Sequence, residues 1–173
     1  MVYGSRLNSI KEGDTSERLF VDVMEKRGWE VFKASKEDQF KHIDFYVSKN
    51  GVRISVDVKS QKRASAFDRD LLEDWVWVEF AGHSGSKGWL YGEQTHIAFH
   101  TVEGFLLVSR ESLVSFCESR VDTNSPTWEW ASEAREAKYK LYRRWSAAEG
   151  KSLEKSALIN LSDLKSEITY KLV

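Results

Sequence analysis

The chain has 173 residues with a formal net charge of −1, and 41% of them are hydrophobic and 31% charged. Such a chain is long enough for one soluble globular domain with a sizeable core. The near-zero net charge excludes a uniformly basic nucleic-acid-binding surface, so any polyanion must bind a local patch.

The single cysteine, Cys117, excludes an intramolecular disulfide and a multi-cysteine zinc site. The sequence contains no apolar run of about 18 residues and no charged-then-apolar N-terminus. We therefore expect no membrane span and no signal peptide, and a cytoplasmic location is the simplest interpretation.

A first helix is predicted to begin at an N-cap, Asp14 or Thr15, and to end at Gly28. Glu17 lies on the apolar stripe of this helix, so its side chain points toward whatever the helix packs on. A capping box between Asp14 and Glu17 is the structural alternative for this glutamate.

The residues from His42 to Ser60 predict a β-hairpin, because two alternating runs flank Asn50-Gly51, a strong signal for a type I′ turn. A two-residue turn there sets Asp44 opposite Asp57, with their Cβ atoms ~5 Å apart. Adjacent like charges repel unless a cation joins them, and a divalent metal ion would do so. Alternating apolar residues make the other face of the hairpin a core surface, and they are Ile43, Phe45, Val47, Ile54, Val56 and Val58.

The rest of the chain predicts an α/β protein, in which a mixed central sheet is flanked by helices and followed by a C-terminal helical extension. A Pro-containing segment favours a boundary between a core of residues 1–125 and an extension of residues 126–173, which is packed on the core. Strands are predicted over 29–34, 75–80, 95–100, 105–108 and 157–161, and helices over 109–117, 128–148 and 162–168.

The order of these elements resembles the PD-(D/E)xK nuclease superfamily, whose core is an α-β-β-β-α-β unit similar to restriction endonucleases. The resemblance covers residues 13–110, and locally it is most similar to the Holliday junction resolvases. It is carried by the helical Glu17, by Ile43-Asp44 and by Val56-Asp57-Val58-Lys59-Ser60. Ile43 stands where the motif has proline, and Asp57 stands in a position that is often glutamate.

The resemblance implies a metal-dependent endonuclease that hydrolyses phosphodiester bonds in DNA with Mg²⁺, for which Mn²⁺ can substitute. Asp44, Asp57 and the Val58 carbonyl are the expected metal ligands, and Glu17 binds a second metal or orients a water. Lys59 and Gln61 complete the expected catalytic set, with Lys59 positioning or deprotonating the water. Phosphate contacts are expected from Lys41, Ser60, Lys62 and Arg63.

Three alternatives stay open at this point. The chain could be a nucleic-acid- or protein-binding module that keeps the nuclease fold without cleavage. Asp44 and Asp57 could also be paired with Lys59, Arg53 or Lys41 on a solvated sheet face. His42, on the same face, is either a helper of the metal site or an ordinary surface histidine. A homodimer is one further expectation, because cutting two strands requires two sites.

Overall fold

The computed structural model describes residues 3–63, 70–124, 139–143 and 153–173. The chain forms two compact units, each built from segments that are separate in sequence. The first unit contains Met1–Gln61, Glu93–Arg110 and Tyr170–Val173, and the second contains Lys62–Gly92 and Glu111–Thr169. The boundary predicted between residues 125 and 126 falls outside the described residues.

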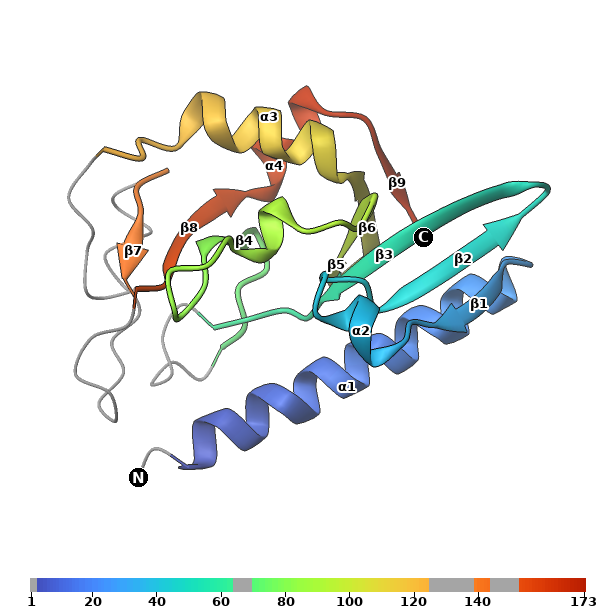
Figure 1. Ribbon diagram of the computed structural model, residues 1–173. Helices are drawn as coiled ribbons and strands as arrows, with labels where there is room; N and C mark the ends of the chain where they lie inside the picture. Colours follow the sequence, from blue (N-terminus) through green and yellow to red (C-terminus); the bar gives the residue numbers. More distant parts are fainter. Residues whose placement is uncertain (1–2, 64–69, 125–138, 144–152) are drawn as a thin grey trace. The chain divides into compact units, whose positions relative to one another are not determined.

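The first unit is built on a six-stranded mixed sheet with the strand order β1-β2-β3-β5-β6-β9 (Figure 1). Only β3 and β5 pair in parallel, and the chain between these two strands passes through the second unit. The prediction of an α/β protein with a mixed sheet is confirmed. The elements are α1 (Tyr3–Lys26), β1 (Glu30–Lys33), α2 (Lys36–Gln39), β2 (Phe45–Lys49), β3 (Val52–Lys59), β5 (His96–Thr101), β6 (Gly104–Ser109) and β9 (Tyr170–Leu172).

The turn between β2 and β3 has the predicted type I′ character. Asn50 and Gly51 have φ angles of 52° and 79°, the left-handed values that this turn requires at both central positions. The strands pair in the register that a two-residue turn sets, with Tyr46 opposite Ser55 and Phe45 opposite Val56. The predicted register is therefore confirmed, and with it the division of the hairpin into two faces.

Two glycine substitutions should change stability in opposite directions. A Cβ at Gly51 meets no atom within 4 Å, but φ is +79° there, so Gly51→Ala should destabilise the protein by about 1 kcal/mol through backbone strain alone. Gly13 lies inside α1 with equally open space, so Gly13→Ala should stabilise it by roughly 0.5–1 kcal/mol. Urea unfolding of both variants measures the difference, and equal effects would contradict the turn assignment.

Helix α1 covers the apolar face of the hairpin in the first unit (Figure 1). The Phe20 ring packs edge-on against Phe105 at 5.3 Å between centroids and lies 6.0 Å from Phe45. Burying aromatic rings of this size is worth a few kcal/mol each, which makes this cluster a main source of stability. The buried cluster comprises Phe20, Met24, Phe45, Val47, Val56, Val58, Ala98, Phe105 and Leu107.

The predicted start of the first helix is wrong. The helix begins at Tyr3, so Asp14 and Thr15 lie in its interior, where the Thr15 hydroxyl donates to the Lys11 carbonyl at 2.8 Å. A capping box between Asp14 and Glu17 is excluded for the same reason. The polar run before Asp14 carries too little apolar periodicity to predict the additional turns.

The second unit contains a three-stranded sheet with the order β4-β8-β7. Its described elements are β4 (Trp75–Ala81), η1 (Trp89–Tyr91), most of α3 (Arg110–Arg120), β7 (Tyr142–Arg143), β8 (Lys155–Asn160) and α4 (Leu161–Glu167). Trp77 and Tyr142 meet edge-to-face at 5.8 Å between centroids, and both pack with the buried Leu158.

The helix predicted over 128–148 is wrong for its described part. Tyr142–Arg143 is a strand paired with β8, because the buried Tyr142 packs on the neighbouring strands instead of on a helical stripe. The other residues of that predicted helix lie outside the described ranges, apart from Tyr139, Lys140 and Leu141. The last helix, α4, is capped by the Asn160 side chain, which accepts hydrogen bonds from the Ser162 and Asp163 amides. None of the helices within the described residues is both long and apolar enough to cross a membrane.

Candidate functional site

The two carboxylates predicted to be neighbours lie side by side in the first unit. Asp44 directly precedes β2, and its amide donates to the Val56 carbonyl at 2.9 Å. The regular register ends one residue later in the chain, at Phe45 opposite Val56, so the predicted pairing of Asp44 with Asp57 across the ladder is not formed. The two carboxylates are neighbours all the same, since the Asp44 charge contributes to the raised pKa of Asp57. One Asp44 carboxylate oxygen, Oδ2, accepts the Val58 amide at 2.8 Å, so this side chain is held against β3.

Asp57 is a buried acid with an incomplete set of partners. Its exposed fraction is 2%, and its Oδ1 pairs with the Lys59 ammonium at 2.7 Å. Its Oδ2 has no hydrogen bond within the described residues. Burial raises the pKa of Asp57 to about 7, against the opposing effect of Lys59 and with a further contribution from the Asp44 carboxylate. A buried anionic oxygen that lacks a donor is a position that a cation would stabilise.

His42 lies at the edge of this carboxylate pair. Its backbone has φ of 64°, an uncommon left-handed value for a residue other than glycine, in the turn that leads into Asp44. Burial, together with the nearby Lys59 charge, lowers its pKa, and the Asp44 carboxylate opposes that shift. The imidazole is therefore mainly neutral at pH 7, and its pKa depends on the charges of both Lys59 and Asp44.

Glu17 is engaged elsewhere. Its carboxylate forms a short ion pair with Lys33. Lys33 pairs with Phe45 in the β1–β2 register and its ammonium lies 4.5 Å from the Phe45 ring, so it belongs to the sheet face that α1 covers. Asp57 lies on the opposite face, because it directly follows Val56 and successive side chains of a strand alternate between faces. To act with Asp44 and Asp57, the Glu17 side chain has to leave Lys33.

The other predicted site residues are distributed over both units. Ser60 and Gln61 follow β3 directly and are half-buried. Lys41 lies three residues before Asp44 and pairs with Glu93 at 3.7 Å. Lys62 and Arg63 belong to the second unit, where their carbonyls accept from the Leu72 amide and the Trp77 indole.

The residues present fit a hard divalent cation. Mg²⁺ takes oxygen ligands and keeps several waters, so one or two carboxylates are enough to hold it. Asp44 and Asp57 supply that pair, and the unpartnered Asp57 Oδ2 needs a positive neighbour. Among the residues that the structure describes, no third His, Cys, Asp or Glu joins them in a group of metal-ligating side chains.

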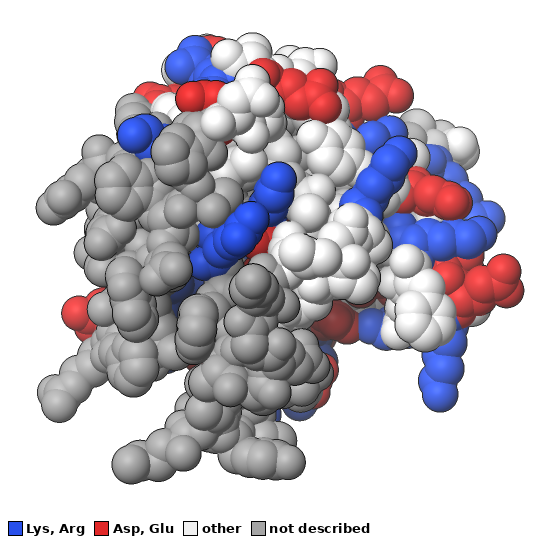
Figure 2. Space-filling view, turned by 60° about the vertical axis from the view of Figure 1, so that its left-hand side comes forward, with Lys and Arg blue, Asp and Glu red and all other residues white. Residues whose placement is uncertain are grey.

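The surface charge agrees with the composition. On the face drawn in Figure 2, basic and acidic side chains of the described residues are intermixed, as expected for a net charge of −1. A nucleic acid that bound to the described part of this face would meet local contacts and not a broad basic surface.

Sequence patterns did not single out the contact between Arg53 and Tyr46, whose guanidinium and ring lie 4.7 Å apart on the face that carries Asp57. The predicted hairpin register could have revealed this contact, since Tyr46 pairs with Ser55, which is two residues from Arg53 on the same face. It was missed because Tyr46 and Arg53 are common surface residues, whereas two neighbouring acids are unusual.

No family model matches the chain, and neither a curated protein nor a solved structure matches it. The resemblance to the PD-(D/E)xK superfamily therefore remains a prediction from the motif residues.

Proposed function

We propose that the protein is a metal-dependent endonuclease that hydrolyses phosphodiester bonds in DNA and belongs to the restriction-endonuclease-like superfamily. The proposal is carried by one observation, the buried Asp57 carboxylate that lies beside the Asp44 carboxylate and has one oxygen without a hydrogen-bond donor among the described residues. The strand order gives partial support, because a β1-β2-β3 meander that pairs in parallel with β5 is expected for such a core. The described residues between β3 and β5 form β4 and η1, where the α-β-β-β-α-β unit has a helix.

In this proposal Asp44 and Asp57 hold Mg²⁺, with the Val58 carbonyl as an expected third ligand. When bound, Mg²⁺ supplies a Lewis acid that stabilises charge on the phosphate oxygens and increases the acidity of a coordinated water. Asp57 orients Lys59 through their 2.7 Å ion pair. The Lys59 ammonium in turn positions the attacking water and neutralises negative charge that develops in the transition state.

The ion pair between Asp57 and Lys59 is also what the structural alternative predicts. That alternative requires a solvated pair, however, and Asp57 is 2% exposed. Burying a carboxylate costs several kcal/mol unless its partners compensate for the lost water, and one oxygen has no hydrogen bond within the described residues. A purely structural pair would be more stable with that oxygen satisfied.

Thermal melts with Mn²⁺ test whether this pair holds a metal. We expect the wild type to gain about 2.7 kcal/mol when free Mn²⁺ is roughly a hundredfold above its Kd, because a ligand that binds only the folded state stabilises it. Asp57→Asn should lose most of this gain. The matched control is Asp22→Asn, an exposed acid on α1, which should keep it.

The same proteins are then assayed on supercoiled plasmid and on labelled oligonucleotides, with Mg²⁺ or with EDTA. Cleavage that needs Mg²⁺ and disappears in Asp57→Asn supports the endonuclease. A Mn²⁺ stabilisation of equal size in both aspartate variants would falsify the metal site, and absence of cleavage of every substrate by the wild type would contradict the activity.

A further inference from the structure

Three residues of the hairpin and its neighbouring edge strand form a strip beside the carboxylate pair, which we call the aromatic strip: Phe32, Tyr46 and Arg53. Phe32 pairs with Tyr46 across β1 and β2, and Tyr46 pairs with Ser55 across β2 and β3. Residues opposite each other in a ladder share a face, so the strip lies on the face of β3 that carries Asp57. Two residues along a strand span ~7 Å, which is the separation along β3 between Ser55, the partner of Tyr46, and Asp57.

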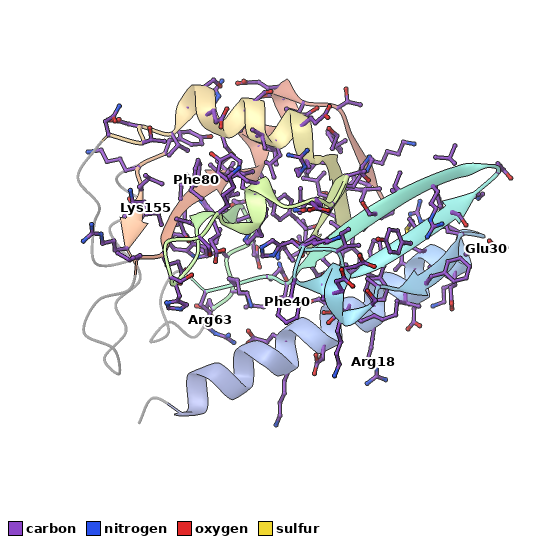
Figure 3. The ribbon with its side chains drawn as sticks, in the orientation of Figure 1. Arg18, Glu30, Phe40, Arg63, Phe80 and Lys155 are labelled. Atoms are coloured by element: carbon purple, nitrogen blue, oxygen red, sulfur yellow. The ribbon has the colours of Figure 1, made fainter. Side chains whose placement is uncertain are left out.

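The side chains on this face become less exposed to solvent from the sheet edge toward Asp57. Phe32 is 54% exposed and Arg53 is exposed, whereas Tyr46 is half-buried and Asp57 is buried. The Arg53 guanidinium lies 4.7 Å from the centre of the Tyr46 ring and is held there by a cation–π contact. Figure 3 labels Glu30 at the outer end of β1 and Phe40 near α2. The strip therefore leads from an exposed edge of the sheet toward the acids.

An ordinary stabilising role explains only part of this arrangement. Cross-strand aromatic pairs make a small stabilising contribution to a sheet, which accounts for Phe32 lying beside Tyr46. It does not account for a phenylalanine that stays more than half exposed on an edge strand, where an apolar side chain favours unwanted association. Exposed aromatic side chains on a sheet face do have a known use, because they stack on unpaired nucleobases.

We propose that the aromatic strip binds single-stranded DNA by stacking unpaired bases on Phe32 and on the Tyr46–Arg53 pair, and so guides the strand to Asp44 and Asp57. This inference rests on the proposed function and specifies its substrate as DNA with unpaired bases next to the cleaved bond.

The chemistry of the strip favours single strands over intact duplex. In a duplex the faces of the bases are already stacked on each other, and duplex binding depends on Lys and Arg contacts to phosphates. The strip contains one cation, Arg53, and the next row holds an acid, Glu30, which accepts from Ser48 at 3.1 Å. Stacking, with a small electrostatic contribution, is therefore the interaction that this surface can supply, and binding should depend only weakly on salt.

Fluorescence anisotropy with labelled oligothymidine and a blunt duplex of equal length, in EDTA, tests this inference without cleavage. We expect the wild type to bind the single strand more tightly. Phe32→Ala should weaken that binding about tenfold, since one stacked base contributes on the order of 1–3 kcal/mol. Phe32→Leu keeps an apolar side chain for the sheet and should also weaken binding, because it lacks a ring.

The matched control is Val52→Ala, since Val52 is 55% exposed in the same sheet, beside the hairpin turn, but its side chain lies on the opposite face. Unchanged affinity in Phe32→Ala, an equal loss in Val52→Ala, or tighter binding of the duplex would each overturn the inference. Cleavage assays with Mg²⁺ separate the two proposals. Single-strand binding without any cleavage would support the binding role of the aromatic strip and contradict the endonuclease. Cleavage with a KM that Phe32→Ala does not change would contradict only the role of the aromatic strip.

Discussion

Asp57→Asn is expected to raise the stability of the metal-free protein by about 2–4 kcal/mol at pH 8 and to remove most of its pH dependence between pH 4 and 7. Asp57 has a pKa of about 7 in the folded protein, above its ordinary value of 3.8, because it is buried. Between these two values the folded state holds a proton that the unfolded state has released. The free energy of unfolding of the wild type therefore falls as pH rises from about 4 through about 7, and it stays at the lower level above that range.

Asparagine is uncharged like the protonated acid, and its amide can donate a hydrogen bond to the neighbouring Asp44 carboxylate. Urea unfolding in EDTA at several pH values measures the effect, with Asp22→Asn as the exposed control. The gap between wild type and Asp57→Asn should widen from pH 4 to pH 7 and then remain constant. A gap that is independent of pH would show that Asp57 is ionised throughout this range and that burial does not control it.

Lys59→Met should lower the rate of Mg²⁺-dependent cleavage by about 10²–10⁴-fold, the range typical for loss of a positioned acid–base group. Methionine keeps the length and apolar stem of lysine but removes the ammonium that lies 2.7 Å from Asp57. The effect should appear in the single-turnover rate at saturating enzyme, because the ammonium acts on the reacting phosphate and water.

The control for this variant is Lys36→Met, on the exposed side of α2, which should change the rate less than about fivefold, as expected for a distant surface charge. Folding is checked at pH 6, where Asp57 is protonated and the loss of its partner leaves no uncompensated buried charge. Full activity of a folded Lys59→Met protein would remove Lys59 from the mechanism.

Asp57→Asn and Lys59→Met both test whether ionised Asp57 destabilises the metal-free protein but is needed for activity. An acid that is costly to ionise in the empty site becomes favourable once a cation neutralises it, so stability without metal and activity with metal should respond in opposite directions to Asp57→Asn. This opposition is common at functional sites, where groups are held in environments that do not stabilise the fold. It distinguishes the proposed endonuclease from a structural ion pair, whose removal would lower stability at every pH.

Local patterns in the sequence determined most of the first unit. Asn50-Gly51 selects a type I′ turn, the turn sets the register of Phe45–Lys49 against Val52–Val56, and the alternation along β3 puts Asp57 on the face away from the apolar residues. Each step depends on residues close in sequence and on the two-residue period of a strand. The strands of this unit could be predicted for the same reason, with the exception of the short β9 at the chain end.

Only the tertiary structure decided the rest. Periodicity placed Glu17 on the inner stripe of α1, but pairing with Lys33 on the face that α1 covers directs its carboxylate away from Asp57. Tyr142 belongs to a strand because β8 and Trp77 offer it a buried site, a contact that no local pattern contains. Burial of Asp57, which sets its pKa, depends on segments distant in sequence. The sequence alone determined which residues neighbour each other in the hairpin, whereas the environment that gives them their chemistry came from long-range packing.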